Sequence, residues 1–394
     1  MKPEIKSCVL LVLLLFFSSS AYRVSALTGD DPTALGAQII EGQLKNSEVG
    51  TIKKALDEAL KVSGTETINL SSDTLLENAV KGKPMDNLKG FPSLLLSLLG
   101  KEIKGNIALM MELIAIMLLS ALLKGLQPRE NGLSPESVKL AVNGVIAIIA
   151  AASFGSIVKV AQGTIESMQV LASVAMPALF ALMASSGQIV TASVLQPLML
   201  AGVNVACHIF KTVLLPLAIM AGILFLVDSI SDRFKLKTLA KLLKSCTIWV
   251  TSAITLIFSL AVTLQRLAGS SIDAAAVKTA KFAIGTLVPV AGKNMSDAAE
   301  TLLSCTNAVR NAAGIVTVIV LGVICFMPFL KILVMMLTYR LAAAFGAPLC
   351  DGGICDSLED AAGCMMVMVG IMGASLFVLI LLTGTLISGS GMVL

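Results

Sequence analysis

Several stretches of this chain run for about 17 or more residues with almost no charged side chain, which is long enough for a helix to cross a bilayer. This feature constrains the fold more than any other. Only 14% of the residues are charged, whereas ordinary globular domains carry about a quarter. A β-barrel would alternate polar and apolar residues, and that alternation is absent. The sequence therefore predicts an all-α, polytopic helical membrane protein.

We expect eight membrane-spanning helices after an N-terminal signal peptide, together forming a transmembrane domain over 106–394. The fourth and fifth spans are predicted to form a tight hairpin, because almost no chain separates them. The predicted spans are 107–123, 140–158, 168–185, 189–210, 212–227, 246–264, 315–337 and 363–388.

The first residues have the pattern of a secretory signal peptide. Lys2 and Lys6 precede an apolar core at 8–17, and small residues stand at the positions before a cleavage site. We predict a signal peptide over 1–26 that is cleaved after Ala26. An uncleaved signal anchor is the alternative. In either case the chain that follows begins outside the cytoplasm.

The segment after the signal peptide is the only part of the chain that looks soluble. We predict an extracytoplasmic helical region over 27–105 that ends in an interfacial amphipathic helix at 91–103. A spacer and a docking module for an extracytoplasmic partner both fit this region. Helical spacing in 47–62 predicts one apolar face, made by Ile52, Ala55, Leu56 and Leu60.

Lysine and arginine residues in short loops set the orientation of membrane helices. Counting spans from an outside N-terminus places the loop at 229–245 in the cytoplasm, where its positive charge favours it. We expect this loop to lie on the inner leaflet as a basic amphipathic helix. Loops 124–139 and 338–362 fall on the same side, and the C-terminus falls outside. The basic residues of loop 229–245 are Arg233, Lys235, Lys237, Lys241 and Lys244.

A polar stripe interrupts the apolar pattern near residue 300. On a helix, six polar residues recur at spacings of four and three and so share one face. Charges that face lipid are costly, so the stripe must face water or protein. Two interpretations remain: the helix lies at the outer membrane surface, or it lines an aqueous cavity or a subunit interface. The six residues are Lys293, Asp297, Glu300, Ser304, Asn307 and Asn311.

Other ionisable and metal-binding residue types give weaker signals. Glu112 falls inside the first predicted span, where a carboxylate is protonated, hydrogen-bonded to another helix or part of an ion path. Asp297 and Glu300 are candidate partners for Lys293 and Arg310. His208, the only histidine, falls at the outer end of the fourth span. The cysteines near the C-terminal span have no accompanying histidine, so we expect no metal site.

A weak internal repeat aligns Pro177 with Pro289 and Pro216 with Pro328. The two copies would cover about 140–230 and 252–342. Chance alignment is the competing explanation, because identity elsewhere is very low. If the repeat is real, its copies are parallel, as in some transporters.

No catalytic motif is present. The chain has no phosphate-binding loop, no HExxH and no nucleophile paired with a histidine base. We therefore expect a protein that is not an enzyme and holds no cofactor. The basic residues follow the membrane topology, so we expect no nucleic-acid partner.

Two segments resemble those of a known family. VAMPALFALMASSG (174–187) and LVPVAGKNMSDAAETLLSC (287–305), together with the signal-plus-polytopic layout, are similar to the stage III sporulation protein AE family of endospore-forming bacteria. The resemblance covers essentially the whole chain. The segment 287–305 is its most specific part, and 27–90 is its least distinctive.

The resemblance implies a function that composition does not. It implies a multi-pass component of the mother cell–forespore channel, a secretion-like complex in the mother-cell membrane around the forespore. It implies a role in forespore development after engulfment. The implied partners are the other stage III A-operon products and the forespore stage II protein Q. It assigns no catalytic residue, and a homo-oligomer is left open.

Two other functions fit the residues. An autonomous secondary transporter for a small solute would explain Glu112, the prolines and the repeat. A structural scaffold without a path through it would explain the membrane helices alone. The sequence does not separate a conduit from a scaffold.

Overall fold

A computed structural model describes eight parts of the chain. They are residue 42 and residues 47–62, 72–80, 91–125, 135–228, 236–287, 292–348 and 352–387. The predicted signal peptide at 1–26 lies outside them. Within the described parts every regular element is a helix and no strand occurs, which confirms the predicted all-α class.

The helices follow one another with short connections. α7, η2 and α8 form one uninterrupted helical path, in which η2 is a single π-helical segment. The elements are α3 (Ser47–Val62), α4 (Ser72–Val80), α5 (Phe91–Gly125), α6 (Pro135–Ser185), α7 (Ile189–Ile209), η2 (Phe210–Leu214), α8 (Leu215–Asp228), α9 (Lys237–Leu287), α10 (Gly292–Gly346) and α11 (Gly352–Ile387).

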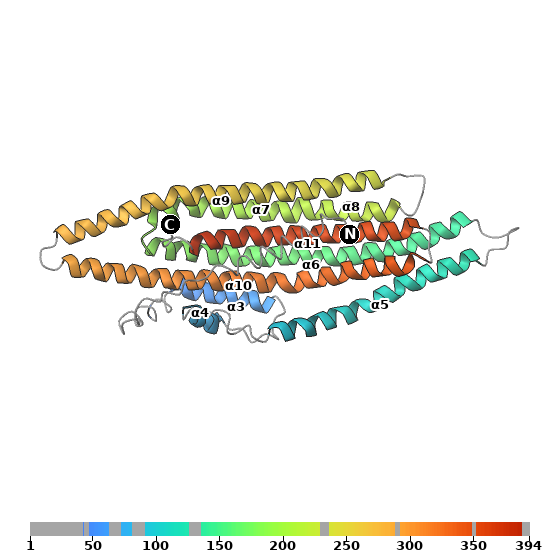
Figure 1. Cartoon of the computed structure of the whole chain (residues 1–394), viewed down its shortest axis with the longest axis horizontal. Helices are drawn as coiled ribbons and strands as arrows, with labels where there is room; N and C mark the ends of the chain where they lie inside the picture. Colours follow the sequence, from blue (N-terminus) through green and yellow to red (C-terminus); the bar gives the residue numbers. More distant parts are fainter. Residues whose placement is uncertain are drawn as a thin grey trace.

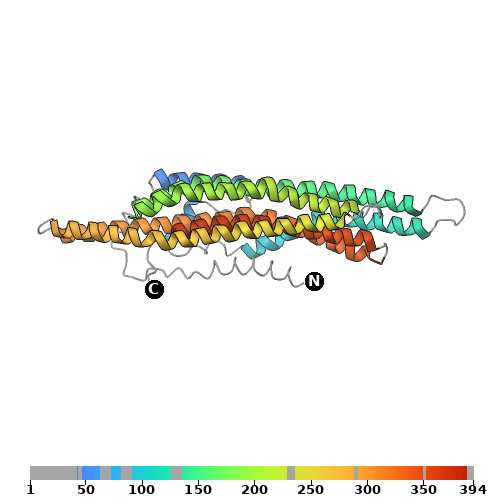
Figure 2. The same ribbon diagram turned by 90° about the horizontal axis from the view of Figure 1, so that it is seen from above.

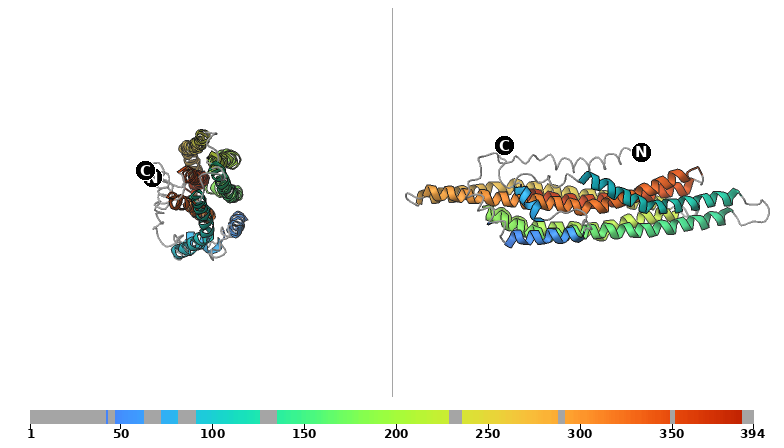
Figure 3. Two further views of the ribbon diagram at one scale, coloured as in Figure 1. Left: turned by 90° about the vertical axis from the view of Figure 1, so that its right-hand side faces the viewer. Right: turned by 90° about the horizontal axis from the view of Figure 1, so that it is seen from below.

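The long helices form an antiparallel bundle along one axis (Figure 1). Seen from above and end-on, the bundle has two layers (Figures 2 and 3). One layer contains α6 and the α7–α8 path, and the other contains α9, α10 and α11. At one end of the bundle, α9 and α10 project past the turn between α6 and α7 (Figure 1). We call this the α6–α7 end and the opposite end the α8–α9 end.

Five described helical segments are long and apolar enough to cross a membrane: Leu140–Ser185, Ile189–Asp228, Lys237–Leu264, Ala298–Gly346 and Gly353–Ile387. They support the prediction of a polytopic membrane protein. They also correct two details of the expected spans. The predicted spans 140–158 and 168–185 are one continuous helix, α6. The predicted hairpin 189–210 and 212–227 is the straight α7–α8 path. The predicted first span, 107–123, lies within α5 and stays a prediction.

The merged spans have a physical reason, which concerns the charged residues that lie between the predicted spans. Glu166 lies in the middle of α6 and Lys211 in η2, and both side chains reach the surface of the bundle. Their charged groups pair at 2.8 Å. A helix that can place its polar residues on an exposed face has no need to end at them. His208, expected at the outer end of a span, consequently lies in mid-path.

The expected basic amphipathic helix at 229–245 is also different in the structure. Its second half is the beginning of α9, which continues without a break into the predicted span 246–264. Arg233 and Lys235 lie outside the described residues. α5 is likewise unbroken from Phe91 to Gly125, so the predicted interfacial helix and the first span share one helix.

Close packing between and within the layers depends on aromatic and small residues. The rings of Phe154 in α6 and Tyr339 in α10 meet edge to face, with centroids 6.5 Å apart. The Tyr339 hydroxyl donates to the Ala150 carbonyl at 3.3 Å. Gly222 in α8 faces Phe154 so closely that a Cβ would lie 2.6 Å from its ring. Small residues of this kind let helices in a membrane protein approach one another.

The predicted apolar face of α3 is confirmed, and it is buried against other helices of the same chain. Ile52, Ala55 and Leu56 are buried, while the side chain of Leu60 is not described. α3 packs against α6 and α10, and α4 packs against α10. Asp57 of α3 accepts a hydrogen bond from the backbone N–H of Ser72 at the start of α4. These two helices therefore cover part of the surface of α6 and α10.

The predicted internal repeat is not settled by this arrangement. Each predicted copy contains two long helical segments, α6 and α7–α8 in the first and α9 and α10 in the second. Aligning Pro177 with Pro289, however, places the α6–α7 turn opposite the interior of α10. The duplication stays a prediction.

Candidate functional site

The turn between α6 and α7 is the point where buried polar groups from three helices meet. It consists of Ser186, Gly187 and Gln188. The N–H of Gln188 donates to the Met183 carbonyl at 3.2 Å and that of Gly187 to the Ala184 carbonyl at 3.1 Å. This is the pattern of a helix that ends with a left-handed residue. Gly187 has a φ of +90°, which glycine adopts without steric cost.

A carboxylate from α9 caps the start of α7. Asp273 is 4% exposed. Its Oδ1 accepts from the N–H of Val190 at 3.1 Å and its Oδ2 from the N–H of Thr191 at 3.2 Å. Gln188, the residue at the N-cap position, makes no side-chain cap of its own. Asp273 therefore supplies both the missing acceptors and a negative charge where the helix dipole favours one.

A guanidinium from α10 reaches the other side of the same turn. Arg310 is fully buried. Its Nη1 donates to the Ser186 hydroxyl at 2.8 Å and to the Gln188 amide oxygen at 3.2 Å. Its Nε and Nη2 make no hydrogen bond within the described part of the chain. We name Asp273, Arg310 and the turn 186–188 the turn clamp.

The partners of Arg310 correct the sequence-based expectation. Asp297 and Glu300 were candidate partners, but the described partners of Arg310 are a hydroxyl and an amide of the α6–α7 turn. Glu300 lies ten positions earlier on the same helix, about 15 Å along its axis at 1.5 Å per residue. That distance is too long for an ion pair with Arg310.

The sequence did not reveal the turn clamp. Asp273 lies 83 residues from Val190 along the chain, and Arg310 lies 124 residues from Ser186. Only the SSG sequence of the turn carried a local signal, because glycine is common after a helix end. No local pattern says which distant carboxylate will cap α7.

The polar stripe of α10 extends outward from the level of the turn clamp. Glu300 and Ser304 are exposed, and Leu303 lies next to Gly187 of the turn, so Ser304 stands at the level of the turn and Glu300 beyond it. Asn307 and Asn311 are half-buried, and their Oδ1 atoms are buried without a hydrogen-bond partner among the described residues. The side chains of Lys293 and Asp297 are not described.

The stripe belongs to one helix that continues to Gly346. It therefore runs along the axis of the bundle. Its first part, from Lys293 to Glu300, lies on the arm that α9 and α10 extend beyond the α6–α7 turn (Figure 1). Such a stripe offers polar groups to water or to another protein at the outer end of α10, and from Glu300 onward it lies within the candidate span Ala298–Gly346.

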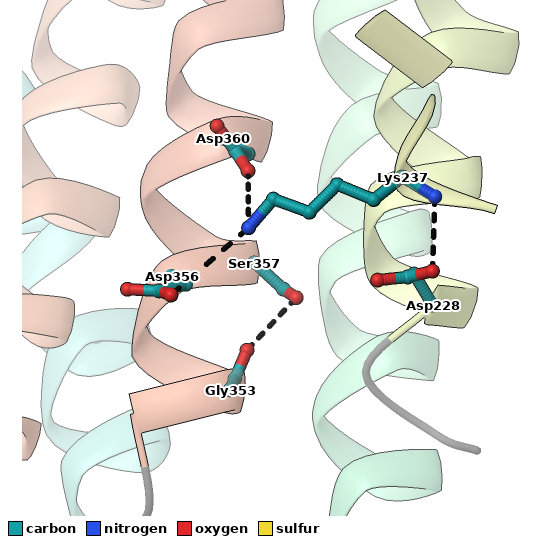
Figure 4. A network of polar contacts seen from close by, with 6 residues as sticks. All are labelled: Asp228, Lys237, Gly353, Asp356, Ser357 and Asp360. Carbon is teal, nitrogen blue, oxygen red and sulfur yellow. Dashed lines mark hydrogen bonds and ion pairs between the residues drawn. The ribbon is translucent and has the colours of Figure 1, made fainter. Parts of the chain in front are cut away.

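The α8–α9 end carries a second polar network (Figure 4). Nζ of Lys237 lies 3.2 Å from Oδ2 of Asp360 and 4.0 Å from Oδ2 of Asp356, both on α11. The backbone N–H of Lys237 donates to Asp228 at the end of α8, at 2.9 Å. This network joins α8, α9 and α11, but its side chains are partly exposed.

The remaining predicted site residues lie apart from both networks. Glu112 is exposed on α5. Lys241 is exposed, and Lys244 lies 6.0 Å from the centre of the Phe225 ring. No three His, Cys, Asp or Glu side chains in the described ranges are placed to hold a metal ion.

The bundle, its apolar spans and its polar networks define a polytopic helical membrane protein with a polar arm at one end. The chain belongs to the stage III sporulation protein AE family, whose model matches residues 70–391. It is 29% identical over 295 residues to Stage III sporulation protein AE of Bacillus subtilis (strain 168), a match that covers 72% of this chain and 74% of that protein. No solved structure matches the chain.

The family match confirms the resemblance inferred from the sequence. It begins at residue 70 and so covers α4 and all the long helices. Both networks and the polar stripe fall within it. The family links the chain to sporulation.

Proposed function

We propose that this protein is an integral membrane component of the mother cell–forespore channel and is required for forespore development after engulfment. The observation that carries the proposal is the family match over residues 70–391. We propose a non-enzymatic role, in keeping with the absence of a catalytic motif in the sequence.

The architecture supports this proposal by offering surfaces to partners at both ends. The projecting arm of α9 and α10 carries the outer part of the polar stripe. With the N-terminal region outside the cytoplasm, the arm would lie in the space between the two membranes that surround the forespore. Other stage III A-operon products and the forespore stage II protein Q are the proposed partners there.

The same orientation puts the α8–α9 end in the mother-cell cytoplasm. Lys241 is exposed there on the first turns of α9. Basic residues next to a membrane helix favour the cytoplasmic side. The proposed location is therefore the mother-cell membrane around the forespore.

The first experiment is a clean deletion in the source organism, followed through growth and sporulation by microscopy. We expect normal vegetative growth and small, collapsing forespores after engulfment, restored by a copy expressed in the mother cell. A growth or nutrient defect in vegetative cells with normal spores would contradict the channel role. That outcome would favour the autonomous transporter.

The second experiment tests the polar stripe. We expect the double substitution Asp297→Lys and Glu300→Lys to abolish sporulation while the protein stays in the membrane at its normal level. Glu359→Lys, at an exposed acidic residue of α11 at the other end, is the matched control and should sporulate. If the double variant also sporulates normally, the stripe is only a solvated face.

A further inference from the structure

The exposed face of the α7–α8 path is apolar over a length much greater than the hydrocarbon core of one bilayer. Its large exposed side chains run from one end of the path to the other and include Ile189, Val194, Leu198, Val205, Val213, Met220 and Val227. From the first to the last of these the helix rises about 57 Å, whereas a hydrocarbon core is about 30 Å thick. At a tilt of about 40°, the upper end of the usual range, the face rises about 44 Å, which only the full bilayer with its interfacial layers, about 40–45 Å, can cover.

α9 gives the contrast. Within its apolar span, Lys237–Leu264, the large exposed apolar side chains run from Leu239 to Leu264, about 38 Å, which a bilayer with its interfacial layers covers; exposed Phe282 lies beyond this span. Trp249 on this face is 75% exposed. The bilayer with its interfacial layers therefore covers the apolar span of α9 without any tilt, whereas it reaches both ends of the α7–α8 face only at the extreme tilt.

Polar groups divide the α7–α8 face near its middle. Lys211 of η2 pairs with Glu166 of α6 at 2.8 Å, and their side chains are 32% and 60% exposed. The Gln169 amide donates to Asn204 at 2.9 Å, also on the exposed side. If the bilayer is centred here, these charges stand in hydrocarbon, which is costly. If the bilayer covers one half of the face, the other apolar half faces water.

Either placement requires protein against this face. We propose that a second copy of this chain packs against the α7–α8 face, so that neighbouring copies meet along α7, η2 and α8. The charge pattern favours a copy of the same chain. Glu166 and Lys211 pair within one chain, so they lie at one height along the bundle axis. A rotation axis parallel to the bundle keeps heights unchanged, so the acid of one copy meets the base of the next.

Site-specific photo-crosslinking tests the proposal in membranes of a non-sporulating host. The full chain carries the photoreactive residue p-benzoylphenylalanine at Val205, Val213 or Met220. The matched controls are Leu256 and Leu260, exposed on α9. Two differently tagged copies are expressed together. We expect a product of twice the chain's mass that contains both tags from the α7–α8 positions, and none from the α9 positions.

Charge reversal distinguishes contact between copies from a role within one chain. Glu166→Lys alone or Lys211→Glu alone places like charges opposite each other across the interface. We expect either variant to lower the crosslinked fraction about tenfold, which corresponds to about 1.4 kcal/mol. Co-expression of the two variants should restore crosslinking between their tags, because a lysine of one variant then faces a glutamate of the other across the interface. The pair within each chain stays broken in that experiment, so a purely intrachain role predicts no rescue.

The single tryptophan of the chain provides a check that does not depend on crosslinking. Trp249 fluorescence should be quenched strongly by brominated lipid tails, because α9 faces lipid. A tryptophan placed at Val213 in a Trp249→Phe background should be quenched much less.

Three results would overturn the proposal. They are a crosslinked product that contains a different protein, crosslinking from α9 but not from α7–α8, and equal quenching at both positions. None of these measurements depends on sporulation, so they separate failure of this contact from failure of the proposed channel role.

Discussion

The two ends of the bundle hold their helices together with the same kinds of side chain in opposite surroundings. At the α6–α7 end, Asp273 and Arg310 are buried and their partners include the backbone and side chains of one turn. At the α8–α9 end, Lys237 pairs with two carboxylates of α11, and all three side chains are partly exposed. Burial makes each lost contact expensive, whereas water and salt screen an exposed pair. We therefore expect the α6–α7 end to be rigid and specific and the α8–α9 end to be tolerant of change.

The largest effect should follow removal of the carboxylate that caps α7. Asp273→Ala leaves two N–H groups without acceptors, one buried and one partly buried, so the free energy of unfolding should fall by about 2–4 kcal/mol. The measurement is an unfolding titration of the purified protein in mixed micelles. Asp273→Asn, which keeps one acceptor oxygen, is the control and should lose less. Equal stability of the alanine variant and the unmodified protein would show that the turn clamp contributes nothing.

Replacement of the buried guanidinium should have a smaller effect of the same sign. Arg310→Met removes two hydrogen bonds, but it also removes nitrogens that are buried without partners in the described residues. Because these contributions oppose each other, we expect a loss of about 1–3 kcal/mol in the same titration. A variant more stable than the unmodified protein would mean that burial of Arg310 serves function at the expense of stability.

A substitution in the turn itself tests the backbone of the α6–α7 end. In Gly187→Ala the new Cβ would lie 3.2 Å from Cγ2 of Val277, and the residue must keep a positive φ. We expect a loss of about 1–2 kcal/mol, the usual penalty for a left-handed conformation in other residues. Gly163→Ala is the matched control, since its Cβ would meet nothing within 4 Å in α6. The control should be neutral or slightly stabilising, and similar losses in both variants would contradict the argument.

The smallest effect should come from the α8–α9 end. Lys237→Met removes a partly exposed ion pair, and such pairs contribute about 0–1 kcal/mol. The difference from the unmodified protein should shrink in about 1 M salt, where the screening length is about 3 Å. Unfolding titrations at low and high salt check this. A loss as large as that of Asp273→Ala would remove the distinction between the two ends.

The fold class, the buried face of α3 and the family could be predicted from local patterns in the sequence. The apolar runs predicted an all-α membrane protein, and the described helices confirm that class. The spacing of Ile52, Ala55 and Leu56 predicted the buried face of α3. The segments 174–187 and 287–305 pointed to the sporulation family that the comparison confirms. These predictions succeed because composition, helical periodicity and family motifs are properties of neighbouring residues.

The number and continuity of the spans depended on contacts that no local pattern contains. Lys211 lies between the predicted spans 189–210 and 212–227, and Glu166 lies between 140–158 and 168–185. In the sequence 45 positions separate the two residues. In the folded chain they face each other from neighbouring helices, so both helices continue through them. The contacts of Asp273 with the start of α7 and of Arg310 with the α6–α7 turn likewise join residues that are far apart in the sequence. A polar residue in an apolar chain must find a partner or an exposed face, and only the packing of distant helices decides which one it finds.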